Sequence, residues 1–415
     1  MSWTTKRLKH LCVDAGQYGV NVSAEDYASS GHRLIRTSDI TEMGRLGPRD
    51  DAVFVDVPLD ARHQVRDGDL LLSRSGTIGR SLLLGTLEEA STYAGYLVRF
   101  RPRPSTEPRY MAYIAASSGF QSAIQADAVT STIQNFNAER YANITVTLPH
   151  IDEQRRIADF LDAEAIQLDR LAAIRIGQLR LITARVQSYL SRIAEALGDQ
   201  HGTVKVRHVL QKIEQGWSPQ CEDRTAREDE WGVVKAGCVN GGIFDATQHK
   251  TLPAGTKPQL RYRLRTGDLL MSRASGSLDF IGSTGVVPDG SPRQLLLCDK
   301  VYRLCMDRTT MTPEFVALML GTHGVRQRIR LGTSGADGMA NNLPTATVTN
   351  LPLPDVPLSE QADIVKDLHD RQDTARDAKD MLTTQLALLA ERRQAIITAA
   401  VTGQIDVTTA RGVSP

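Results

Sequence analysis

The chain has 415 residues, more than one compact hydrophobic core usually organises, so we expect two or three domains. Hydrophobic residues make up 41%, charged residues 23% and aromatic residues 5%, which is ordinary for a soluble globular protein. The formal net charge of +1 excludes a histone-like protein or a strongly basic tail. It does not exclude nucleic-acid binding, which depends on how basic groups cluster locally.

The first ten residues contain no apolar segment of the kind that a signal peptide needs. No window approaches the roughly 18 consecutive apolar residues of a membrane-spanning helix. The five cysteines form no Cys-x-x-Cys motif and no Cys/His pair at zinc spacing, so we expect reduced thiols rather than a metal site. These features predict a soluble, cytoplasmic protein.

Residues 1–148 are rich in Gly, Pro, Ser and Thr and contain short apolar runs such as Leu70–Leu72. This pattern predicts a first globular domain of mixed α/β structure with a twisted sheet. One helix is expected near the end of the domain, over Tyr110–Ala126, because the segment begins just after Pro108.

Residues 149–202 differ in composition from the preceding domain and predict a first long helix. Between 152 and 198 there is no proline and a single glycine, Gly177. Apolar residues recur three and four positions apart, at Ile157, Leu161, Leu168, Leu171, Ile182, Val186, Tyr189 and Ile193. At 1.5 Å per residue such a helix is on the order of 65–70 Å long.

The two sequence patterns, a globular domain and then a long helix, are repeated in residues 203–356 and 357–415. The first predicts a second mixed α/β domain with a helix over Glu314–Arg330, after the Thr312-Pro313 cap. The second contains no proline or glycine from 359 to 402, and it predicts a second long helix that starts near Ser359 and stops at Gly403.

The chain is a duplication at the level of individual residues. The segment at 65–74, Val-Arg-Asp-Gly-Asp-Leu-Leu-Leu-Ser-Arg, returns at 264–273 as Leu-Arg-Thr-Gly-Asp-Leu-Leu-Met-Ser-Arg, with seven of ten positions identical. The offset grows from 199 to 205 at Pro108/Pro313, and then to 207 at Asn135/Asn342, as loop insertions in the second copy would produce. The repeat is therefore a whole domain with its trailing helix.

The two long helices are expected to pair with each other in antiparallel fashion, since an apolar seam needs a partner and the helices follow equivalent domains. The fold class is then α+β, with two pseudo-symmetric mixed α/β domains joined by two long antiparallel coiled-coil helices. The alternative is two separate coiled-coil segments that bind other chains.

Catalytic motifs are absent from the sequence. Ser75–Arg80 has the small residues of a phosphate loop without its Gly-Lys-Ser/Thr ending, and no Gly-x-Gly-x-x-Gly segment opens a helix. Pro288-Asp289 is followed by Asp299-Lys300, but the adjacent carboxylate and amine would face opposite sides of a strand, unlike a nuclease site. Two large domains without a catalytic site favour recognition.

The polar segments of both domains carry residue types that read DNA. Arginine can grip guanine O6/N7, Asn or Gln can grip adenine, and lysines and hydroxyls suit phosphates. The DNA-binding candidates are Arg36, Ser38, Ser73, Arg74, Arg80, Gln134 and Asn135 in the first domain, and Lys235, Gln248, Lys250, Arg261, Arg263, Ser272, Arg273, Asn341 and Asn342 in the second. For the repeated Gly-Asp-Leu-Leu-x-Ser-Arg segment, a purely structural role in the sheet is an equal alternative.

The junctions carry a family resemblance. They read Ile144-Thr-Val-Thr-Leu-Pro-His-Ile-Asp-Glu-Gln-Arg-Arg-Ile157 and Leu351-Pro-Leu-Pro-Asp-Val-Pro-Leu-Ser-Glu-Gln-Ala-Asp-Ile364. The second helix closes with Glu391-Arg-Arg-Gln-Ala-Ile-Ile-Thr-Ala-Ala-Val-Thr-Gly-Gln-Ile-Asp406. Over essentially its whole length, this pattern resembles the specificity subunits of type I restriction-modification systems.

The resemblance implies two target-recognition domains, each reading one half of a split DNA site, and a helix pair that fixes the gap. It implies two modification subunits that bind S-adenosylmethionine, with two ATP- and Mg-dependent restriction subunits as further partners and no cofactor in this chain. The partner-binding candidates are Glu153, Gln154, Glu360, Gln361, Arg392 and Gln394. The rival interpretations are a protein-binding assembly scaffold and a catalytic fusion such as a nuclease.

Overall fold

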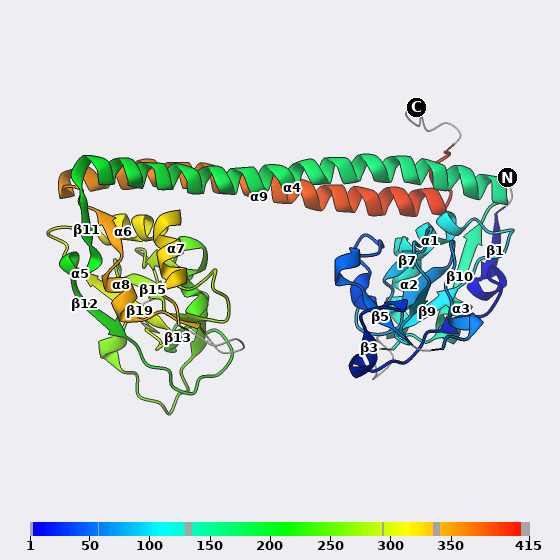
Figure 1. The fold of residues 1–415 in the computed structure, drawn as a ribbon, viewed down its shortest axis with the longest axis horizontal. Coiled ribbons are helices and arrows are strands. Elements are labelled where there is room, and N and C mark those ends of the chain that lie inside the picture. Colours follow the sequence, from blue (N-terminus) through cyan, green and yellow to red (C-terminus); the bar gives the residue numbers. More distant parts are fainter. Residues whose placement is uncertain (1–2, 57, 129–134, 293, 335–340, 408–415) are drawn as a thin grey trace. The chain divides into compact units, whose positions relative to one another are not determined.

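A computed structural model of the chain describes residues 3–56, 58–128, 135–292, 294–334 and 341–407. It divides into two compact units (Figure 1). The first contains residues 1–176 and 383–415, and the second contains residues 177–382. Each unit therefore includes one globular domain together with half of each long helix, a grouping that the sequence analysis did not anticipate.

The first globular domain contains two four-stranded sheets. One has the antiparallel order β2-β9-β6-β7, with β2 (Gln17–Tyr18), β9 (Leu97–Phe100), β6 (Leu70–Ser73) and β7 (Ser81–Leu83). The other has the order β3-β5-β4-β8, with β3 (Tyr27–Ala28), β5 (Val53–Val55), β4 (His32–Ile35) and β8 (Ser91–Tyr93), and β4 and β8 run parallel. Strand β1 (Thr4–Arg7) pairs with β10 (Thr145–Leu148) and closes the domain.

The second globular domain repeats this arrangement. The sheet β12-β19-β15-β17 is formed by β12 (Leu210–Gln215), β19 (Val301–Met306), β15 (Leu269–Ser272) and β17 (Thr284–Val286). A three-stranded sheet contains β14 (His249–Thr251), β13 (Gly232–Val234) and β18 (Leu295–Leu296), and here β13 and β18 run parallel. The remaining pairs are β11 (Thr203–Lys205) with β21 (Pro352–Pro354), and β16 (Ala274–Ser275) with β20 (Asn341–Asn342). Equivalent strand orders, at offsets near 200 residues, confirm the duplication.

The single helix expected in each domain is in fact two helices, so that prediction was wrong in detail. The first domain has α1 (Pro108–Ala116) and α2 (Ser118–Ala128), and the second has α6 (Pro313–Leu320) and α7 (His323–Leu331). Ser117 and Thr322 interrupt them in extended conformation, and their hydroxyls donate to Ile114 O and Met319 O at 2.7 and 2.8 Å. Such side-chain bonds compete with helix continuation. The short helices α3 (Ala138–Asn143), α5 (Val206–Val209) and α8 (Thr345–Thr349) complete the domains.

The long helices are α4 (Ile151–His201) and α9 (Leu358–Val401), and within each unit their halves pack side by side (Figure 1). In the first unit, Ile157 and Leu161 near the start of α4 share a core with Ile397 and Val401 at the end of α9. In the second unit, Leu190 near the end of α4 shares a core with Leu368. Early residues of one helix therefore meet late residues of the other, which confirms the antiparallel pairing and the predicted fold class.

Polar contacts along the two helices follow the same order. Arg393 Nη1 donates to Asp169 Oδ1 at 2.5 Å in the first unit, and Tyr189 Oη donates to Asp367 Oδ2 at 3.0 Å in the second. Helix α9 ends as predicted, with Gly403 at a φ of 75° just beyond its last residue. Within the described ranges, no helix has the length and apolar character that a membrane span requires.

Candidate nucleic-acid interface

Three strands of the first domain end beside one another and bring polar residues together. Arg36 directly follows β4, Arg74 follows β6, and Ala94–Tyr96 follow β8. The backbone joins them, because Arg74 N donates to Tyr96 O and Ala94 N donates to Ile35 O, both at 2.9 Å. We call this group, Arg36, Arg74 and Ala94–Tyr96, the strand-end edge of the first domain.

Arg74 is held in a defined position at this edge. Its Nε donates to Asn135 Oδ1 at 3.2 Å, its Nη1 donates to Gly95 O at 3.3 Å, and its guanidinium lies 4.7 Å from the centre of the Tyr18 ring. Within the described residues, Nη2 forms no hydrogen bond. A guanidinium fixed on one side in this way presents its other side, with further N–H groups, to a ligand.

A shallow hollow lies beside Arg74. It is lined by Asn21, Ser23, Tyr27, Arg36, Ser38 and Tyr96, among others. Arg36 donates to both carboxylate oxygens of Asp39, at 2.7 and 3.2 Å, and this hydrogen bonding raises the pKa of the Arg36 guanidinium. Tyr96 is 65% exposed although it is a large aromatic residue. The hollow therefore combines a fixed cation, hydroxyls and an exposed ring.

The second domain forms an equivalent strand-end edge from Lys235, Arg273 and Cys298–Lys300. Arg273 N donates to Lys300 O at 2.9 Å, as Arg74 N does to Tyr96 O. Arg273 Nη1 donates to Asp299 O at 3.2 Å, and its Nε donates to Tyr302 Oη at 3.1 Å. The repeated arginine is thus fixed by a carbonyl of the neighbouring turn in both domains.

The predicted asparagines also lie at these edges. Asn135 contacts Arg74 directly. Strand β20, which is Asn341–Asn342, pairs with β16, the two residues immediately after Arg273. The structure therefore brings arginine and amide side chains together from segments that lie about 60 residues apart in the chain.

Lys235, Gln248 and Lys250 gather on the neighbouring strands β13 and β14. Lys235 N donates to Gln248 O at 2.8 Å. The ammonium groups of Lys235 and Lys250 lie 3.7 and 3.1 Å from the exposed carboxylate of Asp223. That carboxylate partly offsets the positive charge of the pair.

Two predicted serines do not lie on the surface. Ser73 and Ser272 are completely buried, each as the last residue of a strand whose four residues are all buried. Ser73 Oγ donates to Thr77 O and accepts from Arg80 N at 3.0 Å, so it holds the turn after β6. The structural alternative therefore fits these serines better than DNA contact. Arg80 donates to Ile40 O at 2.9 Å, and Gln134 lies outside the described residues.

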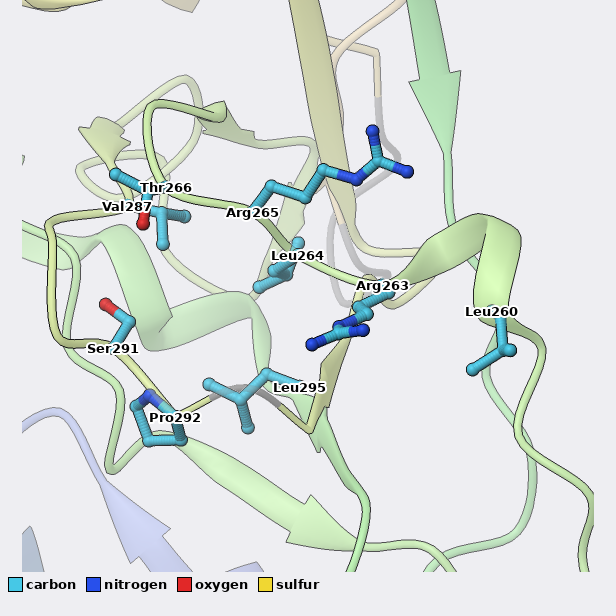
Figure 2. Close-up of a pocket in the computed structure, with 9 residues that line it drawn as sticks. All are labelled: Leu260, Arg263, Leu264, Arg265, Thr266, Val287, Ser291, Pro292 and Leu295. Carbon is cyan, nitrogen blue, oxygen red and sulfur yellow. The ribbon is translucent and has the colours of Figure 1, made fainter.

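Arg261 and Arg263 lie at a different place from Arg273. Arg263 lines a hollow beside the segment that enters β15, whereas Arg273 follows the end of that strand (Figure 2). Figure 2 shows the Arg263 side chain at this hollow and the Arg265 guanidinium pointing away from it. Arg261 stacks on Tyr262, with 4.5 Å between its guanidinium and the ring centre, and donates to Gln259. The backbone of this segment lies beside the residues that lead into the strand-end edge, since Leu297 N donates to Tyr262 O at 2.8 Å and Arg263 pairs with Leu296.

The junction residues expected to bind partners have mixed environments. Gln154 and Gln361 are 1% and 0% exposed and bond within the protein, so burial does not fit the partner contact predicted for them. Glu153 is also buried and pairs with Arg156. Glu360 and Arg392 are exposed, and Gln394 donates to Ala116 O at 2.8 Å from an exposed position.

The sequence analysis missed Tyr96 and Lys300, which occupy equivalent exposed positions in the two edges. Their residue types differ, so the internal repeat could not reveal them. The available signal was the placement of each residue in a short turn between two apolar strands, Tyr93-Ala-Gly-Tyr96 and Leu297-Cys-Asp-Lys300.

No metal or thiol chemistry emerges from the described part of the chain. It contains no group of three or more His, Cys, Asp or Glu side chains placed to hold a metal ion. Burial raises the pKa of the Cys12 thiol to about 12, and it also raises the pKa of Cys238, so neither forms a thiolate readily.

Comparison with known proteins points to one family. Residues 60–174 match the type I restriction modification DNA specificity domain. The chain is 24% identical over 413 residues to the type I restriction enzyme EcoKI specificity subunit of Escherichia coli K12, covering 94% of this chain and 85% of that protein. Over nearly its whole length, the chain resembles a type I specificity subunit.

Two further matches agree. The chain is 22% identical over 419 residues to the StySPI specificity subunit of Salmonella potsdam, with the same coverage of 94% and 85%. A solved structure, described as the structural basis of complex assembly and conformational transition of the type I R-M system, matches with a TM-score of 0.70. It is 18% identical and covers 97% of this chain and 98% of that one, which shows a common fold. Specificity subunits recognise DNA sequence, and catalysis resides in partner subunits.

Proposed function

We propose that each globular domain of this chain reads one half of a bipartite, asymmetric target in double-stranded DNA. The paired helices α4 and α9 set the number of unread base pairs between the halves. The same helices dock two modification subunits. The strand-end edges, built around Arg74 and Arg273, make the sequence-reading contacts.

One observation carries this proposal: the same edge is built twice, and each copy fixes one arginine. In both domains Nη1 of the arginine bonds a carbonyl of the adjacent turn, Gly95 in one and Asp299 in the other. A fixed arginine can form paired hydrogen bonds with guanine O6 and N7, and each such pair discriminates by about 1–3 kcal/mol. Nearby amides of Asn135 and Asn342 have the chemistry to bind adenine.

The differences between the edges support two different half-sites. Tyr96 in one copy is replaced by Lys300 in the other, and Arg36 by Lys235. An aromatic ring can stack on or pack against bases, whereas an ammonium group suits phosphate or guanine. Two readers with the same framework and different exposed residues fit an asymmetric target.

The helices support the spacer and docking roles. They pack through buried apolar residues in each unit, which makes the pair stiffer than a flexible linker. They also expose large apolar side chains, among them Ile166, Leu181 and Met381, which are 66%, 71% and 64% exposed. Exposed apolar residues on a long helix are suited to contact with another subunit.

The remaining chemistry is assigned to the partners. Under this proposal two modification subunits bind S-adenosylmethionine and methylate adenine, and two restriction subunits, where present, use ATP and Mg²⁺. This chain itself takes no cofactor and works in the cytoplasm, where its DNA target lies.

Methylation-sensitive sequencing of whole genomes tests the proposal. Cells with the chain are expected to carry methylated adenines in one motif made of two short sequences separated by a fixed gap. Deletion of the chain should abolish that methylation throughout the genome. A motif that survives deletion, or a continuous motif without a gap, would contradict the proposal.

A further inference from the structure

One buried glutamine makes hydrogen bonds at the joint between the first domain and its long helix. Gln154 lies in the first turn of α4. Its Oε1 accepts from Glu107 N, the cap of α1, at 3.0 Å, and its Nε2 donates to Pro149 O at 2.9 Å. One side chain thus ties α4 to the start of α1 and to the strand connection that leads into α4.

The second domain has the same joint at Gln361, 207 residues later. Its Oε1 accepts from Thr312 N, the cap of α6, at 2.8 Å. Its Nε2 donates to Val356 O and to Thr310 O, both at 2.9 Å. Both glutamines are almost wholly inaccessible to solvent. The repetition of this bond pattern in both copies indicates a shared mechanical role.

We propose that Gln154 and Gln361 are positioning residues that fix the tilt of each domain on the helix pair and thereby the spacing between the two half-sites. The inference rests on the proposed function, because spacing has meaning only if both domains read one duplex. Neither glutamine is available to touch DNA.

A simple lever shows why tilt matters. A side chain at Gly68 would lie 3.4 Å from Pro108 Cγ, so Gly68 sits next to the joint. Arg74 lies six residues further along the chain, just after β6, which is a reach of at most roughly 20 Å at 3.3 Å per residue. A tilt of about 10° at the joint therefore moves Arg74 by up to about 3.4 Å, the rise of one base pair. A loose joint would accept neighbouring spacings.

The two joints are not equally reinforced. In the first unit, Arg109 of α1 pairs with Asp159 and Asp162 of α4 at 2.8 and 2.7 Å, and Tyr113 Oη donates to Asp162 at 2.6 Å. At the position equivalent to Arg109, the second domain has Glu314, and within the described residues Glu314 forms no ion pair with α9. We therefore expect the Gln361 joint to depend more strongly on its glutamine.

The experiment is a selection from a random DNA library with the full chain assembled with its modification subunits. Wild-type protein is compared with Gln154→Leu, Gln361→Leu and Gln361→Glu. Leucine removes both bonding groups at similar size, whereas glutamate keeps the acceptor for Thr312 N and loses the donor. Gln327→Leu is the control, because Gln327 is an exposed glutamine on α7 whose amide bonds the nearby His323 side chain at 2.8 Å.

We expect the base sequence selected in each half-site to stay the same in all variants. In Gln361→Leu, the ratio of the main spacer to spacers one base pair longer or shorter should fall by about ten-fold, since several buried polar groups lose their partners. Gln154→Leu should lower this ratio by only about two- to three-fold, Gln361→Glu should lie between wild type and Gln361→Leu, and Gln327→Leu should match wild type.

The recovered half-sites also report folding, because a misfolded domain selects no motif. A wild-type protein that selects no bipartite motif would refute the proposed function itself. If the wild-type motif is bipartite but both leucine variants keep the wild-type spacer ratio, the positioning role is overturned and the proposed function stands. The positioning role would also be overturned if the leucine variants lost the base preferences of a half-site together with the spacer preference. It would likewise be overturned if Gln327→Leu lowered the spacer ratio as much as they do.

Discussion

Replacing Arg273 by lysine is expected to relax one half of the DNA target and leave the other half unchanged. Lysine keeps the positive charge but lacks the planar group that bonds Asp299 O and Tyr302 Oη while presenting further N–H groups. Loss of one paired base contact costs about 1–3 kcal/mol, or roughly 5- to 150-fold in Kd. Binding to duplexes with each half-site mutated in turn measures the effect.

Arg74→Lys provides the matched variant and should relax the opposite half by a similar factor. Arg62→Lys is the control, since Arg62 is 63% exposed and pairs with Asp60 at 3.0 Å away from the strand-end edge. A uniform loss of affinity for all sequences, with unchanged preference, would mean that these arginines contact phosphates rather than bases.

Lengthening both long helices should change the spacing of the target. Seven residues inserted after Ile176 and seven after Leu382 add about 10 Å to each helix, or about three base pairs. The extended protein should prefer a spacer longer by about three base pairs. Its affinity for the original spacer should fall by at least about 100-fold, because both domains can no longer engage one duplex. Selection from a random DNA library measures both the preferred spacer length and the relative affinity for the original spacer.

Insertion into α9 alone is the control for this experiment. It shifts late residues of α9 by about 10 Å relative to their partners on α4, so it breaks contacts such as Asp169–Arg393. That protein should bind neither spacer well. If the doubly extended protein still selects the original spacer, the helices do not act as the spacer.

Much of the architecture could be predicted because it has a periodic or repeated cause. The helix period of apolar residues predicts α4 and α9, and the repeated 65–74 segment predicts two like domains. The break at Ser117 could not be predicted in this way, since it depends on a hydroxyl that bonds its own backbone instead of facing solvent. Glycine and proline mark breaks in a sequence more clearly than serine does.

The candidate site was only partly predictable for a related reason. Residue type indicates what a side chain can bind, and on that basis Arg74 and Asn135 were both candidates; their contact with each other became visible only in the structure. It does not indicate burial. Strand β6 is covered on both faces, so Ser73 is internal, and Gln154 points into the joint. Tyr96 and Lys300 were not among the candidates because equivalent positions of the two domains need not share a residue type.

Site-specific photo-crosslinking tests the central claim most directly. A photoreactive amino acid replaces Tyr96 in one protein and Lys300 in another, and each is irradiated on the selected duplex with its modification subunits. The account predicts crosslinks from position 96 within one half-site only and from position 300 within the other only. Crosslinks from both positions to the same half, or to the unread gap, would contradict it.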